Sequence, residues 1–218
     1  MGSIVGIGDS VTAATACDCR GFVSALAEAR TTTHRSWHSV NLGTSGATAK
    51  DVAAQLAHAV SPDIVNADVI LVTVGANDLL PALGRWEDGP CRPGCPAPET
   101  RGALSAVAQI VHRIQGVTQG RAQIFVLGYW NVFPDGSVGL SRFGPLYPAW
   151  SDGITRSYDA GLLALCQQAK VRYVDLYRPF KGDGQDADDG LLAADGDHPD
   201  AAGHAVITRA LLAAGAAA

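Results

Sequence analysis

Short apolar runs alternate along the chain with longer segments in which apolar residues recur at helical spacing. The short runs are rich in Val and Ile and almost continuously apolar, which is typical of strands covered on both faces of a sheet. We expect strands at residues 4–7, 40–42, 69–74, 124–127 and 171–176. We expect helices in the Ala-rich segments 49–60, 103–117, 154–170 and 201–214.

This alternation of strands and helices predicts the fold class. Successive strand–helix–strand units make right-handed crossovers, which produce a parallel sheet between two layers of helices. We therefore expect one α/β domain over residues 1–218, a flavodoxin-like three-layer α/β/α sandwich with a five-stranded parallel sheet. Ligands of such sheets bind beyond the carboxyl ends of the strands. The segments 80–98 and 131–151 look irregular, and we expect them to form walls of a cleft.

Composition narrows the classes of function. With 47% hydrophobic and 17% charged residues, the 218-residue chain can bury one substantial core. Its formal net charge is -5 and its Lys and Arg residues are scattered, so it offers no basic surface for nucleic acid. Its apolar stretches are too short or too interrupted to cross a bilayer, so we expect no integral membrane segment.

The cysteines bear on the cellular compartment. Cys17 and Cys19 lie close together, as do Cys91 and Cys95 in a Gly/Pro-rich loop, while Cys166 stands among leucines. Zinc sites usually pair Cys-x-x-Cys or add histidines at ligand spacing, and neither pattern occurs here. We therefore expect disulfides among the first four cysteines, with their connectivity open, and a buried thiol at Cys166. Disulfides indicate secretion, and we expect a leader that is absent from this chain.

A serine follows the first predicted strand in a setting that suits a nucleophile. In Gly6-Ile7-Gly8-Asp9-Ser10 a tight turn leads into an expected helix, which leaves the Ser10 hydroxyl at the carboxyl edge of the sheet. The alternative is that Asp9 and Ser10 only cap the helix while Gly8 relieves the turn. This segment alone does not separate the two interpretations.

Two further strand ends meet at the same edge. Gly46 comes after the second predicted strand and Asn77 after the third. Acyl transfer passes through a tetrahedral oxyanion, which needs fixed N–H donors. We expect an oxyanion hole made of the backbone N–H groups of Ser10 and Gly46 and the side-chain amide of Asn77. Taken singly, Gly46 and Asn77 are also ordinary turn residues.

A histidine near the C-terminus can supply the base that a serine nucleophile needs. His198 lies in Asp195-Gly196-Asp197-His198-Pro199, after the fifth predicted strand and just before the last helix. A serine hydroxyl reacts at neutral pH only when a histidine takes its proton, and a carboxylate on the other ring nitrogen fixes the tautomer. We expect Asp195 to fold back onto His198 in that role. The alternative is a surface histidine beside solvated aspartates.

Together these segments resemble the conserved blocks of the GDSL or SGNH hydrolases. The blocks are Gly8-Asp9-Ser10, Gly46, Gly75-Ala76-Asn77-Asp78 and Asp195 to Pro199, and their order and spacing match. The resemblance covers essentially the whole chain. It implies an esterase or lipase with Ser10, Asp195 and His198 as the catalytic triad, no cofactor and no metal, and with Asp9 holding the turn rather than reacting.

A looser resemblance concerns the cysteines. The segment from Cys17 to Phe22 and the loop with Cys91 and Cys95 are similar to secreted actinobacterial members of this family, which are commonly disulfide-bonded. The chain departs from many relatives at Val11 and Thr12, directly after the serine, which puts the shape of the pocket in doubt but not the mechanism.

Other polar and aromatic residues fit sites less well. His34 and His38 precede a strand and would not share a helical face as metal ligands, and His58, His112 and His204 fall in helices, where exposure, packing or capping is expected. The acidic segment 183–189 lacks the EF-hand pattern, so we expect a solvated loop rather than a calcium site. The aromatic residues beside the two insertions can line a pocket or form a small core: Trp86, Tyr129, Trp130, Phe133, Phe143, Tyr147 and Trp150.

We therefore expect a monomeric serine-dependent carboxylic ester hydrolase that forms an acyl-enzyme on Ser10 and acts on small-molecule, lipid or acylated-sugar esters. An O-acetyl carbohydrate esterase on the same triad is the alternative within this class. A non-catalytic flavodoxin-like nucleotide-binding module is the alternative outside it, but Val11 stands where the dinucleotide fingerprint has its third glycine. The absence of a Gly-x-Ser-x-Gly elbow excludes an α/β-hydrolase.

Overall fold

The predicted strands form one sheet in which every neighbouring pair is parallel. In this computed structural model, which describes residues 1–89, 97–182 and 189–216, the five strands follow the order β2-β1-β3-β4-β5. They are β1 (Gly2–Gly8), β2 (Trp37–Gly43), β3 (Val69–Thr73), β4 (Gln123–Leu127) and β5 (Arg172–Val174). The predicted α/β fold class with a five-stranded parallel sheet is confirmed.

The burial of the strands follows their apolar content. All residues of β1 and β3 are buried, whereas the edge strand β2 is only partly buried or exposed along its length. The chain winds outward in both directions from β1 and β3, so the end of β1 lies at the point where the winding reverses. In open α/β sheets this point is where ligands bind.

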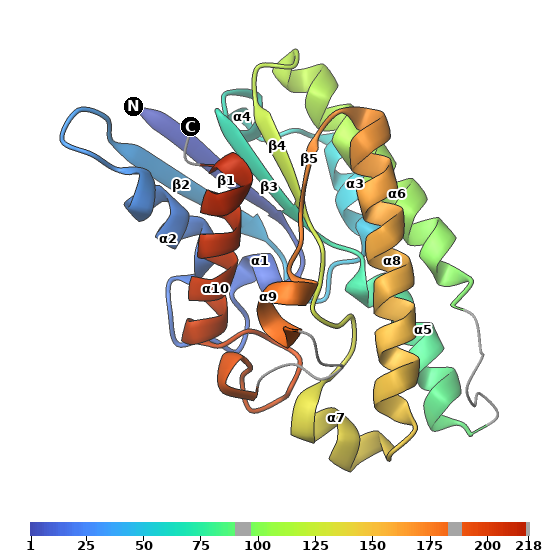
Figure 1. The fold of residues 1–218 in the computed structure, drawn as a ribbon. Coiled ribbons are helices and arrows are strands. Elements are labelled where there is room, and N and C mark those ends of the chain that lie inside the picture. Colours follow the sequence, from blue (N-terminus) through green and yellow to red (C-terminus); the bar gives the residue numbers. More distant parts are fainter. Residues whose placement is uncertain (90–96, 183–188, 217–218) are drawn as a thin grey trace.

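Helices cover both faces of the sheet (Figure 1). On one face α2 (Gly21–Arg30) packs against α10 (Ala201–Leu211), and on the other α6 (Glu99–Thr118) packs against both α3 (Ala49–His58) and α8 (Tyr147–Ala169). The remaining helical elements are α1 (Ser10–Ala13), α4 (Pro62–Val65), α5 (Ala76–Glu87), α7 (Gly136–Phe143), α9 (Tyr177–Lys181), the 3-10 turn η1 (Asp189–Leu191) and the π-type turn η2 (Leu212–Ala216). Within the described ranges, no helix combines the length and apolarity needed to cross a membrane.

The prediction that segments 80–98 and 131–151 are irregular is wrong for much of their length. Helix α5 continues past Pro81 to Glu87, because its neighbours Leu79 and Leu83 bury their side chains in the core. The second segment contains α7 and the first turn of α8. Helix α2 was not predicted, although it buries Phe22 and Leu26 on one face.

Candidate active site

The turn that carries Ser10 is fixed by backbone geometry. At the end of β1, Gly8 has φ +147°, and a Cβ at this position would lie 1.9 Å from the carbonyl oxygen of Thr73, so only glycine fits. The N–H of Asp9 donates to that same oxygen at 3.0 Å. The Asp9 carboxylate then caps α1 by accepting from the N–H of Val11 at 3.0 Å. Ser10 is therefore the first residue of α1 and lies, partly exposed, at the carboxyl end of a central strand.

Asp9 is buried beneath this turn and uses both of its carboxyl oxygens. Its Oδ2 accepts a hydrogen bond from the hydroxyl of Tyr129, while its Oδ1 faces Val11. Burial raises the pKa of Asp9 to about 7, although the hydrogen bonds from Tyr129 and Val11 oppose the shift. Because both oxygens are occupied within the fold, Asp9 is placed to hold the turn.

Asn77 and the segment around Gly46 are joined by a hydrogen bond. Asn77 lies in the first turn of α5, directly after β3, and its side-chain Nδ2 donates to the carbonyl oxygen of Ala47 at 3.0 Å. Gly46 is exposed and has φ +79°, and a Cβ there would meet no atom within 4 Å. The backbone conformation, rather than crowding within the protein, therefore explains the glycine at this position.

The predicted contact between Asp195 and His198 is present. His198 Nδ1 lies 2.7 Å from Asp195 Oδ2, and Asp195 Oδ1 accepts from the N–H groups of Asp197 at 2.9 Å and of His198 at 3.0 Å. Partial burial works to raise the pKa of Asp195, but these hydrogen bonds outweigh it and lower the pKa. An ionised Asp195 calls for a proton on His198 Nδ1, which leaves Nε2 free to act as a base.

The turn that carries His198 is closed on itself. Leu192 and Pro199 form an antiparallel bridge across its base, and the N–H of Ala193 donates to the carbonyl oxygen of His198 at 2.8 Å. At its tip Gly196 has φ +68°, and a Cβ there would lie 2.6 Å from the Cβ of Val138. The tip is therefore packed closely against α7.

A buried ammonium group and two carboxylates support the turn that carries His198. The N–H of Asp135 donates to the carbonyl oxygen of Gly196 at 2.8 Å. The carboxylate of Asp135 lies 3.0 Å from Lys181 Nζ, which also contacts Asp152 at 3.2 Å. The ammonium side chain of Lys181 is 0% exposed. No pattern in the sequence predicts this arrangement, since the three charged residues come from separate segments.

Ser10, Asn77 and His198 line one pocket at the carboxyl end of the sheet, with a volume of about 30 Å³. Gly46 lies outside its lining. The remaining walls are Asp9, Val11, Ala76, Leu80, Tyr129, Trp130, Asn131, Val132 and Asp197. Asn131 and Val132 belong to the segment 131–151 that we expected to form a wall of a cleft, but the sequence did not single them out as site residues, although they follow β4 at the edge of the sheet where the other site residues lie.

Two larger hollows on the described surface lack both Ser10 and His198. One of about 550 Å³ lies between α2 and β2, and another of about 430 Å³ lies between Trp86 and Phe143. Neither is lined by Ser10 or His198. The smaller pocket is therefore the one with the chemistry of a candidate active site.

Most of the aromatic residues singled out in the sequence form a core rather than a pocket. Trp150 stacks on Phe133 at 5.3 Å and on Trp86 at 4.7 Å between ring centroids, and Phe143 stacks on Tyr147. Phe133, Tyr147 and Trp150 are buried. Among these aromatic residues, only Tyr129 and Trp130 line the Ser10 pocket.

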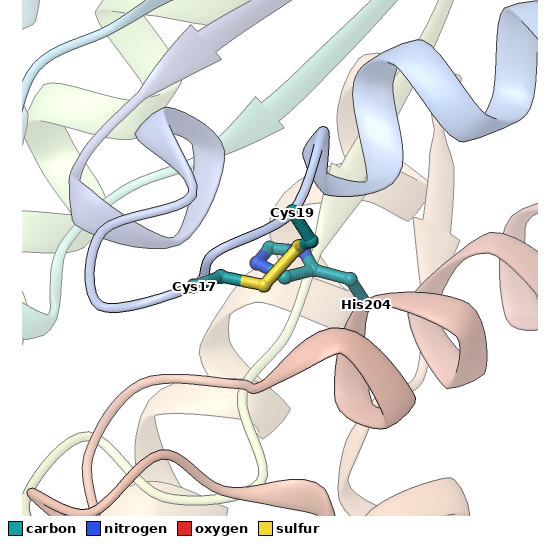
Figure 2. A group of neighbouring side chains, drawn as sticks. All are labelled: Cys17, Cys19 and His204. Carbon is teal, nitrogen blue, oxygen red and sulfur yellow. A yellow bond between two sulfur atoms is a disulfide. The ribbon is translucent and has the colours of Figure 1, made fainter.

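Cys17 and Cys19 form a disulfide, one of the pairings left open by the sequence, and it lies beside the imidazole of His204 (Figure 2). One potential metal-ligand atom from each of the three residues lies within 4.8 Å of the others. However, both sulfurs are bonded to each other, and His204 Nδ1 accepts from the N–H of Phe22 at 3.3 Å. The imidazole thus carries its proton on Nε2 and offers no lone pair toward the sulfurs. Packing, with His204 stacked on Phe22, explains this group.

The remaining cysteines, two histidines and the acidic segment complete the comparison with the sequence. Cys166 is a buried free thiol whose pKa is raised by burial to about 12, as expected of a small apolar residue. His58 and His112 are exposed on their helices. The expected disulfide cysteines Cys91 and Cys95, and the acidic segment 183–189 except for its last residue, lie outside the described residues.

Comparisons with known proteins agree with this fold. A lipase from a goat rumen metagenome has 20% sequence identity and a TM-score of 0.78, with 99% of this chain and 98% of that chain covered. A variant of an acetyl-xylooligosaccharide esterase from Geobacillus Stearmophilus has 18% identity and a TM-score of 0.67, with 98% and 93% covered. At such identities these likenesses show the fold. No curated protein matches the sequence.

The family is shown by the sequence itself. The profile of the GDSL-like lipase/acylhydrolase family matches residues 7–206, which include the Ser10 turn, the Gly46 segment, Asn77 and the turn that ends at His198. The matched region thus contains every strand end that contributes to the pocket. The chain therefore belongs to the GDSL-like lipase/acylhydrolase family and is an ester hydrolase of the esterase or lipase type.

Proposed function

We propose that the protein hydrolyses carboxylic esters through an acyl-enzyme on Ser10, with His198 as general base and acid and Asp195 as its partner. The observation that carries this proposal is the 2.7 Å contact between His198 Nδ1 and Asp195 Oδ2, on a turn whose His198 shares one pocket with Ser10. This contact orients the imidazole and fixes its tautomer, so that Nε2 is the basic nitrogen.

The reaction follows from these groups. Ser10 Oγ attacks the ester carbonyl carbon while His198 Nε2 takes the hydroxyl proton. The tetrahedral intermediate collapses, the bond to the alcohol oxygen breaks, and His198 returns its proton to that oxygen. Water then attacks the acyl-enzyme with His198 again as base, which releases the acid and restores Ser10. Asp195 stays ionised throughout and stabilises the imidazolium.

The developing oxyanion needs hydrogen-bond donors in fixed positions. We assign this role to the backbone N–H groups of Ser10 and Gly46 and to the Asn77 amide. The N–H of Ser10 lies at the start of α1, where an N–H has no partner within the helix. One N–H of the Asn77 amide is held by Ala47, which orients the group and leaves the second N–H for the substrate.

An O-acetyl carbohydrate esterase is the second candidate within the same chemistry. The Ser10 pocket can serve this chemistry with the same triad, because only the ester bond has to reach Ser10 and His198. The structural likeness to an acetyl-xylooligosaccharide esterase points in the same direction. We also infer from the disulfide between Cys17 and Cys19 that the protein works in an oxidising compartment, as secreted proteins do.

Hydrolysis of a p-nitrophenyl ester series from acetate to palmitate tests the proposal. Ser10→Ala should lower kcat/KM by about 10⁶-fold while the circular dichroism spectrum and Tm stay unchanged. Ser105→Ala, an exposed serine on α6, is the matched control and should behave as wild type. Residual turnover in Ser10→Ala close to the wild-type rate would overturn the assignment, and an optimum at acetate would favour the short-acyl candidate.

A further inference from the structure

A carboxyl group that has been given no role so far lines the Ser10 pocket together with Asp9. Asp197 directly precedes His198 and contributes to the lining together with Ser10. It is close enough to Asp9 and Tyr147 for its charge to raise the pKa of both groups, which places its side chain inward. The mechanism proposed above gives this carboxyl group no role.

Asp197 differs from the other two carboxyl groups in having no donor. The Asp9 carboxylate accepts from Val11 and Tyr129, and the Asp195 carboxylate accepts from backbone N–H groups and faces His198. Among the described residues no group donates a hydrogen bond to the Asp197 carboxyl, and only its backbone N–H is engaged, with Asp195. Burial raises the pKa of Asp197 to about 6, although the nearby His198 opposes the shift.

Asp197 is partly exposed, so water can donate to its carboxyl group where the protein does not. Because the group borders the pocket, water fills this role in the free protein and a polar group of the substrate can take it over. The neighbouring walls Leu80, Trp130 and Val132 offer apolar surface instead, so the Asp197 carboxyl is a distinct polar point in the pocket.

The position of His198 decides which part of the substrate meets Asp197. His198 must reach the alcohol oxygen of the ester in order to protonate it as it leaves. Asp197 precedes His198 on the same turn and lines the same pocket, which favours a place for it near the leaving alcohol rather than near the acyl group. A hydroxyl on the carbon next to the ester would be the nearest donor.

We propose that Asp197 is a specificity residue that selects esters of polyhydroxylated alcohols by accepting a hydrogen bond from a hydroxyl adjacent to the scissile ester. This inference rests on the proposed function of Ser10 and His198. It defines the substrate class as monoesters of sugars or polyols that keep a free neighbouring hydroxyl. Esters of simple alcohols lack this donor and are disfavoured, because their binding displaces water from Asp197 without replacing its hydrogen bond.

A matched pair of substrates tests the proposal. Glycerol 1-monoacetate and n-propyl acetate share the acyl group and the carbon chain, and they differ only in the hydroxyls. The measured quantity is the ratio of kcat/KM for the two esters in wild type, Asp197→Leu and Asp197→Asn. A ratio cancels any general loss of active protein. Hydrogen bonds to charged groups contribute about 1.5–3 kcal/mol, so Asp197→Leu should lower the ratio about 10- to 100-fold, mainly through KM.

The possible results distinguish failure of the role of Asp197 from failure of the proposed function. Asp197→Asn keeps an acceptor oxygen but loses the charge, so it should retain part of the preference. Asp88→Asn, an exposed carboxylate outside the pocket lining, is the control and should keep the wild-type ratio. An equal effect of Asp197→Leu on both esters, or a wild-type ratio near one, would refute the role of Asp197 while leaving the triad intact. Failure of wild type to hydrolyse either ester would instead refute the proposed function, and this inference with it.

Discussion

The nucleophile and its base come from regions that are held in place in different ways. Ser10 follows a central strand, and its turn is fixed by the backbone conformation of Gly8 and by the cap from Asp9. His198 lies on a turn between η1 and α10. That turn is held by the N–H of Asp135, which is itself anchored by the buried ammonium group of Lys181.

Because of this contrast, the positions of the nucleophile and of the base should respond differently to substitutions. On the nucleophile side the chain has little freedom, because a strand end and a glycine determine where the serine lies. On the base side the position of the imidazole depends on side chains that are distant in the sequence. Substitution of a buried charge should therefore disturb the base while leaving the nucleophile in place, and a change at Asp195 should remove the chemistry without disturbing either support.

Among the variants that test this comparison, Asp195→Asn should have the largest effect. The amide keeps an oxygen that can accept from the N–H groups of Asp197 and His198, so the turn should persist. Its NH₂ group would face His198 Nδ1 and favour the wrong tautomer, which should lower kcat/KM by about 10⁴-fold. Steady-state kinetics on p-nitrophenyl acetate, with Tm measured in parallel, checks this result. A loss smaller than tenfold would show that Asp195 does not orient the base.

A smaller but still severe effect is expected for Lys181→Met. Removal of one partner of a buried ion pair costs about 3–5 kcal/mol, because the other charges stay buried and uncompensated. Here Asp135 and Asp152 would be left without the ammonium group, and the support under Gly196 would weaken. Urea unfolding should show the loss of stability, and kcat/KM should fall as the His198 turn is displaced.

The matched control for Lys181→Met is an ion pair between α5 and α6 that lies outside the lining of the Ser10 pocket. Arg85 Nη1 lies 2.7 Å from Glu99, but its side chain is 38% exposed, so solvent screens the pair. Arg85→Met should cost no more than about 1 kcal/mol and should not change kcat/KM. Equal losses in the two variants would contradict the view that the base side depends on the buried pair.

The sequence predicted the position of the nucleophile better than it predicted the support of the base. The strands are nearly continuous in Val and Ile, so their positions and the residues that follow them, Ser10 and Asn77, could be placed at one edge of the sheet. The spacing within the Asp195 to His198 turn also predicted their contact, because it is local. These features depend on neighbouring residues or on a repeated pattern, which a sequence displays directly.

The support of the base turn could not be predicted in the same way. Asp135, Asp152 and Lys181 meet only after α7, α8 and α9 have packed, and charged residues in a sequence are normally assigned to the surface. The helix over residues 136–143 was missed for a related reason. Its glycines at 136 and 139 have low helix propensity, and the segment is ordered instead by burial and by the cap from Asp135.

The smallest effect is expected on the nucleophile side, in the pH dependence of stability of Asp9→Asn. The pKa of Asp9 is raised in the folded state from 3.8 to about 7, so the folded protein holds a proton that the unfolded chain has already released between these values. The unfolding free energy of wild type should therefore fall as the pH rises from 5 to 8. At about 1.4 kcal/mol per pH unit over roughly two units, Asp9 should account for about 2–3 kcal/mol of that decrease.

Asn carries no titratable proton and can still accept from Val11, so Asp9→Asn should show a flatter profile in urea unfolding at the two pH values. The pKa of Asp197 is raised as well, so some decrease with pH should remain in Asp9→Asn. Parallel profiles would mean that Asp9 stays ionised beneath Ser10, and the nucleophile turn would then depend on a buried charge as the base turn does.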